Sequence, residues 1–300
     1  MVLLVVAILS ILAGLAGFLA VRRWPRADPA LSASQALGEE VRSHPGPRSF
    51  LRSRLDPATA TGLVLTLALI AMVVTGIVVG LFAWMIRSNR GVVTVDLAVE
   101  RRAAAHASGF TDGVLGTLTH LGDTVTIVGA SIAVGLYGLW RWRRAAVPVF
   151  VLVVVLGQMV ITNVIKVGID RARPALRPRA AFVGSSFPSG HTTAATATYL
   201  AAALVLAIGS SPRARAALAG AGLAIGVAVG CTRVLLGVHY FSDALAGLAI
   251  GLSWFGLCAV AFGGRLMSFG APARVAAAPA VRPPPVEARA STRRGTATPG

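Results

Sequence analysis

Charged side chains are scarce in this chain: they make up 13% of its 300 residues, whereas 55% of the residues are hydrophobic. The few charges lie between long uncharged runs and do not alternate along helix faces. Buried helices of a large soluble protein would need polar faces to form its surface, and these runs have none. The shortage of charge therefore excludes an ordinary soluble fold and indicates a membrane protein.

Seven of the uncharged runs are long enough to span a bilayer, which takes about 20 residues, with about 17 as a practical minimum. They comprise residues 1–21, 57–86, 124–140, 145–165, 192–212, 216–232 and 244–264. We therefore predict an all-α fold, a polytopic membrane helix bundle with seven spans.

Cysteine is nearly absent as well, with two residues in the whole chain. Cys231 lies near one end of a predicted span and Cys258 well along the next, so their thiols would lie at different membrane depths. This placement argues against a disulfide bond. No cluster of His, Asp or Glu has the spacing of metal ligands, and we expect neither a metal ion nor another cofactor.

Lysine is rarer still: of the 28 basic side chains only one, Lys166, is a lysine. The arginines give a formal net charge of +17, which would suit a nucleic-acid-binding protein. Such a protein gathers its arginines on a soluble face with aromatic residues nearby, whereas here they lie at the ends of the spans. We therefore expect no nucleic-acid partner.

The segments at the two ends differ from the central spans. The run at 1–21 lacks the basic leading region of a secretory signal peptide and has arginines directly after it, which predicts an uncleaved transmembrane anchor with an external amino terminus. Residues 22–56 are predicted to be a cytoplasmic linker with one short helix around 31–41. Residues 265–300, rich in Ala, Pro and Arg, are predicted to be a disordered cytoplasmic tail.

The polar segment 87–123 has weakly helical patterning in two places, Asp96–His106 and Gly113–His120. We predict two helices that lie at the membrane interface over the mouth of the bundle. A histidine in such a loop is usually a polar surface residue, so we assign no chemistry to His106 and His120.

Arginine is distributed unequally between the two sides of the predicted bundle. If the turn Arg141–Arg144 is cytoplasmic, as basic turns are, the cytoplasmic segments hold 18 arginines. The external segments hold ten basic residues, and subtracting Lys166, Arg173 and Arg233, which belong to the motifs below, leaves seven. This asymmetry predicts a multi-pass protein of the inner (plasma) membrane with the Lys166–His191 loop outside.

Four polar residues at span ends emerge on one membrane face. Lys166 closes one predicted span and His191 opens the next; two crossings later Arg233 closes a span and His239 opens the last. Because each pair is separated by an even number of crossings, all four lie on the same side. Their combination suits phosphoryl transfer, which needs cations, a nucleophile and an acid.

Several groups suit a bound phosphate. Lys166 falls at a helix end and Arg173, followed by a proline, on the turn beyond it. Ser189 can cap the next helix, while Gly190 lets backbone amides approach an anion. Arg233 offers a planar fork for two oxygens. We therefore assign phosphate binding to these five residues.

Two histidines and one aspartate supply the remaining functions. His239 and Asp243 are four residues apart, so on a helix the carboxylate can orient the imidazole and leave its other nitrogen free to attack. His191, at the amino terminus of its helix, is the candidate general acid. We leave the neighbouring arginines as loop or headgroup contacts with Asp170 as their local partner; they are Arg171, Arg177 and Arg179.

Glycines recur every four residues in the last two spans, at Gly222, Gly226 and Gly230 and again at Gly247 and Gly251. Close helix contact there would bring Arg233 and His239 together. The alternative is that glycine is simply abundant, with 33 in the chain.

Three ordered motifs resemble the signature of the type-2 phosphatidic acid phosphatase superfamily. They are Lys166-x6-Arg173-Pro174, Pro188-Ser189-Gly190-His191 and Arg233-x5-His239-x3-Asp243. The family's third motif usually begins Ser-Arg, and Thr232 stands here instead, which keeps a hydroxyl. The segment Leu118–Asp123 also resembles the family's first external loop. The resemblance covers roughly 57–264, a six-span phosphatase core, and leaves the extra N-terminal span, linker and tail unexplained.

The resemblance implies a metal-independent phosphatase with a phosphohistidine intermediate on His239, assisted by His191. Membrane members act at the outer leaflet on lipid phosphates or pyrophosphates, such as phosphatidic acid, phosphatidylglycerophosphate or polyprenyl pyrophosphate, so the expected partners are such a lipid and the bilayer. Soluble relatives in the family bind vanadate and act as haloperoxidases, but the seven predicted spans argue against that activity here. Two alternatives stay open: a lipid phosphotransferase using the same site, and a non-catalytic lipid-binding or transport protein, which would usually carry a charge mid-span.

Overall fold

The structure is a computed structural model that describes residues 2–23, 60–143, 145–176, 178–180 and 184–267. Within these ranges it has nine α-helices and one short 3-10 helix, so the predicted all-α class is confirmed. Nearly all of the predicted linker at 22–56 and of the tail at 265–300 lies outside the described residues, as does the short helix around 31–41. Those three assignments stay predictions.

The helices follow the uncharged runs of the sequence. Helices α7 and α8 end at Arg143 and Asp170, both in the left-handed backbone conformation that stops a helix. Helices α9 and α10 begin after Ser189 and Ser211, whose side chains each accept a hydrogen bond from the backbone three residues on. The helices are α1 (Val2–Arg23), α4 (Ala60–Arg87), α5 (Val92–Ala105), α6 (Gly109–Thr119), η2 (His120–Gly122), α7 (Thr124–Trp142), α8 (Ala146–Ile169), α9 (Gly190–Ala207), α10 (Pro212–Leu235) and α11 (Phe241–Met267).

Six of the seven predicted spans are long and apolar enough to cross a membrane, namely those in α1, α4, α7, α8, α10 and α11. The seventh run, 192–212, became α9, which has only 18 residues and does not meet the same criterion. Its first half is rich in threonine, which lowers its apolarity. An 18-residue helix is still about 27 Å long, close to the thickness of the hydrocarbon core.

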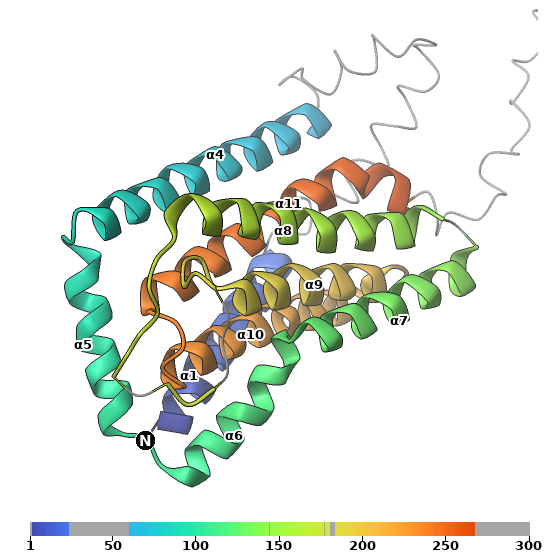
Figure 1. Cartoon of the computed structure of the whole chain (residues 1–300). Coiled ribbons are helices and arrows are strands. Elements are labelled where there is room, and N and C mark those ends of the chain that lie inside the picture. Colours follow the sequence, from blue (N-terminus) through green and yellow to red (C-terminus); the bar gives the residue numbers. More distant parts are fainter. Residues whose placement is uncertain (1, 24–59, 144, 177, 181–183, 268–300) are drawn as a thin grey trace, which may run out of the picture. The chain divides into compact units, whose positions relative to one another are not determined.

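Helix α9 lies in the interior of the bundle, where it packs against α7, α8, α10 and α11 (Figure 1). Eleven of its residues are buried, including Thr192, Thr193 and Thr196. Because its neighbours shield it from lipid, α9 needs no strongly apolar outer face. The helix predicted at 192–212 is therefore present as Gly190–Ala207, but it is less apolar than the other six predicted spans.

The glycine rows of α10 and α11 both face α9. A Cβ atom at Gly222 would lie 2.9 Å from the carbonyl oxygen of Tyr199, and one at Gly247 would lie 2.7 Å from that of Ser189. The predicted close helix contact is thus present, but each row packs mainly on α9 rather than on the other row. The glycines let α9 approach both helices at backbone distance.

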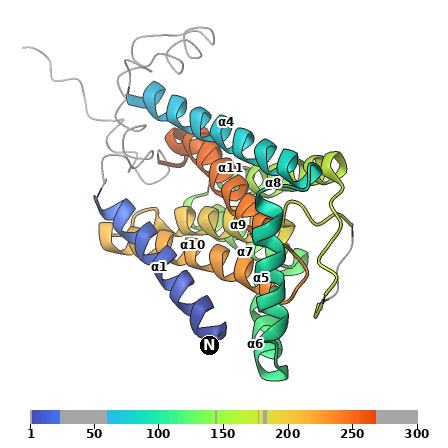
Figure 2. The same cartoon turned by 90° about the vertical axis from the view of Figure 1, so that its left-hand side faces the viewer.

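Helix α1 packs along α10, and α4 packs along α11 (Figure 2). Gly14 and Gly17 of α1 lie against Gly220 of α10, where a Cβ on Gly220 would come within 2.4 Å of the carbonyl oxygen of Gly14. The extra N-terminal span is therefore fitted to the bundle. Helices α5 and α6, predicted as interfacial helices, contact α10, and α5 also contacts α4 and α11.

Substitution at Gly251 tests the close packing on α9. A Cβ there would lie 2.8 Å from that of Thr196 and 2.9 Å from the carbonyl oxygen of Thr193, so Gly251→Ala should overpack the bundle and destabilise it by about 1–3 kcal/mol. Gly256 on the same helix has no atom within 4 Å of its Cβ position and is the matched control. In thermal unfolding of detergent-solubilised protein, the Tm of Gly251→Ala should fall while that of Gly256→Ala stays level or rises. Equal Tm values for the two variants would contradict this packing.

Candidate active site

The ends of four helices meet at one end of the bundle and carry the predicted site residues. The carboxyl ends of α8 and α10 meet the amino ends of α9 and α11 there. The structure brings all eight residues to this place: Lys166 in the last turn of α8, Arg173 in the loop after it, Ser189, Gly190 and His191 at the start of α9, Arg233 in the last turn of α10, and His239 and Asp243 around the start of α11.

Arg173 and His239 are in direct contact. One guanidinium nitrogen of Arg173 lies 3.0 Å from Nε2 of His239 and also donates to the backbone carbonyl of Val238. Because a guanidinium can only donate, Nε2 must carry the lone pair, and the proton of a neutral imidazole is on Nδ1. Arg173 also donates to the carbonyl oxygens of Gly184 and Ser185.

His239 and Asp243 do not share a helix, contrary to the prediction. Helix α11 begins at Phe241, and His239 lies before it in a turn whose N–H groups at Val238 and His239 both donate to the carbonyl oxygen of Arg233. The two side chains meet all the same, with Nδ1 of His239 3.4 Å from Oδ2 of Asp243. This separation is slightly longer than an ordinary hydrogen bond.

The carboxylate of Asp243 is fully buried and held on both oxygens. Oδ2 accepts from the hydroxyl of Ser186 and, at 2.9 Å, from the backbone N–H of Tyr240. Oδ1 accepts from Arg171 at 2.6 Å. Sequence analysis had left Arg171 as a loop or headgroup contact, but its side chain is only 7% exposed and contacts Asp243 instead.

The other loop arginines are also paired elsewhere. Arg179 lies 3.1 Å from Asp112 of α6, so it is not a headgroup contact. Asp170 ends α8 in a left-handed conformation, and the carboxylates that pair with Arg171 and Arg179 belong to other segments. Asp170 is therefore not their local partner. Arg177 lies outside the described residues.

His191 is held by a carboxylate that sequence analysis had not singled out. Its Nε2 lies 2.8 Å from Oδ1 of Asp123, which directly precedes α7, and the second oxygen of Asp123 lies 2.5 Å from Nδ1 of the exposed His120. Burial alone would raise the pKa of Asp123, but hydrogen bonds from the two histidines outweigh it and lower the pKa. The only sequence signal for Asp123 was its place in the segment that resembles the family's first external loop.

A cleft of about 210 Å³ between α7, α8 and α9 contains part of the site. Lys166, Gly190 and His191 line its polar part, and Ile127 and Val128 of α7 contribute to its apolar part. A Cβ at Gly190 would lie 3.9 Å from the ammonium nitrogen of Lys166. The first turn of α9 therefore presents its backbone amides beside a cation, as an anion site requires.

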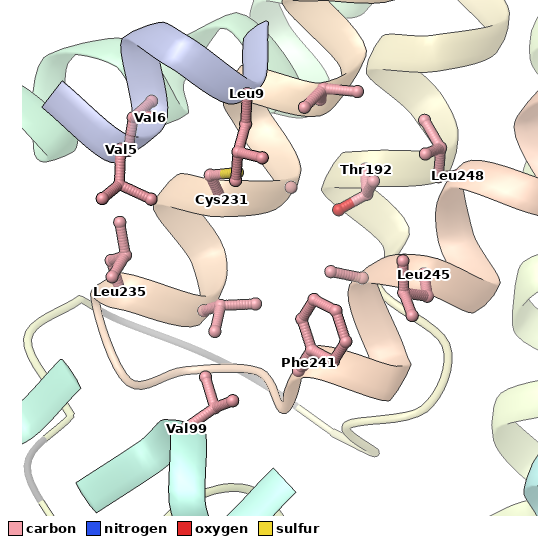
Figure 3. Close-up of a pocket in the computed structure, with 14 residues that line it drawn as sticks. Val5, Val6, Leu9, Val99, Thr192, Cys231, Leu235, Phe241, Leu245 and Leu248 are labelled. Atoms are coloured by element: carbon pink, nitrogen blue, oxygen red, sulfur yellow. The ribbon is translucent and has the colours of Figure 1, made fainter. Parts of the chain in front are cut away.

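A second cavity, of about 200 Å³, lies between α1, α5, α9, α10 and α11 (Figure 3). Its lining is almost wholly apolar, with Val5, Leu9, Leu235 and Phe241 among its walls. The hydroxyl of Thr192 points toward it, yet that hydroxyl already donates to Ser189. This cavity offers no cation and is not where a phosphate would bind.

Burial sets the protonation of the groups in the loops. It lowers the pKa of His239 to about 4, against the opposing effect of the neighbouring Asp243, so the imidazole is neutral at neutral pH. Burial also lowers the pKa of Arg173, which keeps its charge. Among the described residues no three or more His, Cys, Asp or Glu side chains gather as metal ligands.

Part of the chain is similar to known membrane phosphatases. The family described as the PAP2 superfamily matches residues 147–266, which include every predicted site residue. Phosphatidylglycerophosphatase B of Bacillus subtilis is 29% identical over 172 residues, covering 56% of this chain and 83% of that protein. The crystal structure of a transmembrane PAP2-type phosphatidylglycerolphosphate phosphatase from Bacillus subtilis superposes with a TM-score of 0.55 at 26% identity, covering 60% of this chain and 92% of that one.

Residues 147–266, called the PAP2 segment below, are similar to the PAP2 superfamily. The predicted resemblance is thereby confirmed. A lipid A 1-phosphatase of Rhizobium johnstonii is 40% identical over 107 residues, but the chain covers only 40% of that relative's length. Asp96 of α5 and Asp123 lie outside the PAP2 segment, so part of the surroundings of the site comes from the preceding helices.

Asp123→Asn tests whether this carboxylate supports proton transfer by His191. With a weaker acceptor, kcat for an alkyl phosphate should fall about 10-fold, part of the 10²–10⁴ that a general acid typically contributes. An aryl phosphate, whose leaving group needs no proton, should be affected much less. The matched control, His120→Gln, removes only the exposed partner of Asp123, so its kcat should stay within about twofold of the wild-type value for both substrates. Equal losses with the alkyl and aryl substrates would contradict this role.

Proposed function

We propose that this PAP2 protein is a membrane phosphatase that hydrolyses a lipid phosphate or pyrophosphate through a phosphohistidine intermediate on His239. The observation that most supports the proposal is the chain of contacts from Arg173 to Nε2 of His239 and from Nδ1 to Asp243. A nucleophilic nitrogen then faces a cation that can hold the phosphate, with a carboxylate behind the ring.

In the first step Nε2 of His239 attacks phosphorus, and an N–P bond forms as the bond to the lipid oxygen breaks. Lys166, Arg173 and Arg233 stabilise the charge on the phosphoryl oxygens, together with the amides at the start of α9. Asp243 stabilises the positive charge that develops on the imidazole. His191 donates a proton to the departing oxygen; its Nε2 is bound to Asp123, which leaves Nδ1 for this transfer.

In the second step water attacks the phosphohistidine. His191, now neutral, accepts a proton from the water as its oxygen bonds to phosphorus, and the N–P bond breaks. Inorganic phosphate leaves, and His239 and protonated His191 are restored. No step requires a metal ion, because the three cations supply the charge stabilisation.

A lipid substrate is supported by the membrane helices and by the cleft, whose polar end holds Lys166 and His191 while residues such as Ile127 and Val155 form apolar walls. The relatives' names describe enzymes for phosphatidylglycerophosphate and for the 1-phosphate of lipid A. Both present a terminal phosphate on a membrane lipid. Phosphatidic acid and polyprenyl pyrophosphate share that chemistry and belong to the same substrate class.

The two histidines should fail in different ways. His239→Ala should form no covalent phosphoenzyme and should turn over neither alkyl nor aryl phosphates, because the nucleophile is gone. For His191→Ala, kcat with an alkyl phosphate should fall about 10²-fold or more, and an aryl leaving group should partly restore the activity. The measurement is acid-quenched trapping of labelled phosphate from a lipid phosphate in the presence of EDTA, alongside turnover of both substrates.

Label on His191, or normal turnover by His239→Ala, would overturn this assignment. Loss of wild-type activity in EDTA with recovery on adding magnesium would overturn the metal-independent mechanism. Label that passes to a second lipid rather than to water would identify the protein as a phosphotransferase. Binding of the lipid without any turnover would favour the non-catalytic alternative.

The active site should face the outside of the cell, because the segments predicted to be cytoplasmic hold the excess of arginines described above. In a background with both cysteines replaced, Leu176→Cys, a 59% exposed position of the site loop, should react with an impermeant thiol reagent on intact cells. Arg143→Cys, in the turn after α7, should react only after the cells are opened. The reverse pattern of labelling would show that the orientation is wrong.

A further inference from the structure

We infer that Asp96 of α5 and Arg171 act together as positioning residues that hold Asp243, and through it the nucleophile His239, in reactive geometry. The inference rests on the proposed function and extends it to a helix outside the PAP2 segment. Its physical basis is a buried cluster in which one guanidinium joins two carboxylates.

Arg171 uses different nitrogens for its two partners. One lies 2.6 Å from Oδ1 of Asp243, and the other lies 2.8 Å from Oδ2 of Asp96. Both aspartate side chains are fully buried, and the arginine side chain is 7% exposed. The aromatic ring of Tyr240 lies 4.0 Å from the centre of the guanidinium and packs on its face. The planar fork of arginine suits this bridge, because a single ammonium cannot present two fixed directions.

Asp96 also fixes the start of α11 directly. Its Oδ1 accepts from the backbone N–H of Ser242 at 2.9 Å, and its Oδ2 accepts from the hydroxyl of Ser242 at 2.6 Å. That hydroxyl in turn accepts from Arg171 at 2.9 Å. Ser242 is the residue before Asp243, so Asp96 holds both the backbone that carries Asp243 and the arginine that contacts its side chain.

The charges of the cluster favour the proposed chemistry. A guanidinium in contact with Asp243 would by itself offset the negative charge that stabilises the imidazolium of His239. Asp96 supplies a second negative charge on the far side of Arg171, so the three groups together keep a net charge of −1. Arg171 can then hold Asp243 in place without cancelling its electrostatic effect on His239.

The inference predicts a defect confined to the attack on phosphorus. Asp96→Asn keeps the size of the side chain but removes its charge, and it should slow phosphohistidine formation about 10- to 100-fold, as expected when a nucleophile is slightly misplaced. Inhibition by inorganic phosphate, which needs only the cations, should stay within about threefold. Inhibition by orthovanadate, which gains a fifth bond from Nε2 of His239, should weaken by about the same factor as the rate.

Glu100 provides the matched control. It is a second buried carboxylate on α5, one turn beyond Asp96, and it accepts a hydrogen bond from the backbone of Leu176 rather than from Arg171. Glu100→Gln should form the phosphohistidine within about threefold of the wild-type rate. If it is as slow as Asp96→Asn, the effect belongs to the docking of α5 in general and the inference is overturned.

A wild-type rate in Asp96→Asn, or a loss of phosphate inhibition in proportion to the rate, would equally overturn it. If Asp96→Asn does not yield folded protein, Arg171→Lys is the alternative variant, because lysine keeps the positive charge but cannot bridge two carboxylates in fixed directions. Arg171→Lys must then show slow formation of the phosphohistidine, unchanged inhibition by phosphate and weakened inhibition by vanadate. Failure of the proposed function is seen separately, as absence of phosphohistidine in the wild-type protein itself.

Discussion

The close approach of α9 to the glycine faces of α10 and α11 is the constraint on which the site depends. With side chains at Gly222, Gly226 or Gly247, the backbones could not come so near. The same packing sets Ser189, at the start of α9, against the first turn of α11, where its N–H donates to the carbonyl oxygen of Asp243 at 3.0 Å. The turn proposed to bind phosphate and the residue proposed to orient the nucleophile, Asp243, are thus connected through the backbone rather than through mobile side chains, which favours preorganisation.

The basic side chains around the candidate site differ in the partners that they contact. Arg171 and Arg179 are paired with carboxylates, whereas Arg173 donates to His239, which is neutral, and to backbone carbonyl oxygens. Arg233 donates to the hydroxyl of Thr119, which is likewise neutral. Under the proposed function, a phosphate binds among Lys166, Arg173 and Arg233.

Sequence alone predicted the long helices and a set of eight candidate site residues that the fold brings together, because long apolar runs and ordered polar motifs are local signals. It assigned Arg173 to phosphate binding but left Arg171 as a loop or headgroup contact, because the carboxylates that bury Arg171 lie far away in the chain. It missed Asp96 and Asp123, because their partners lie 146 and 68 residues further along the chain. It also took α9 for an ordinary span, since the neighbours that shield its threonines exist only in the folded bundle.

The division between the PAP2 segment and the helices before it has a chemical meaning under the proposed function. The PAP2 segment holds every group that would contact the phosphate, whereas the carboxylates that hold Arg171 and His191 from outside it, Asp96 and Asp123, come from α5 and from the turn before α7. In the present structure Arg173 occupies Nε2 of His239, and the ring is 3.4 Å from Asp243. Attack therefore requires the incoming phosphate to draw Arg173 away from Nε2. The ring can then close on a carboxylate that Arg171 and Asp96 have already fixed in place, so the reorganisation on binding is confined to Arg173 and the imidazole.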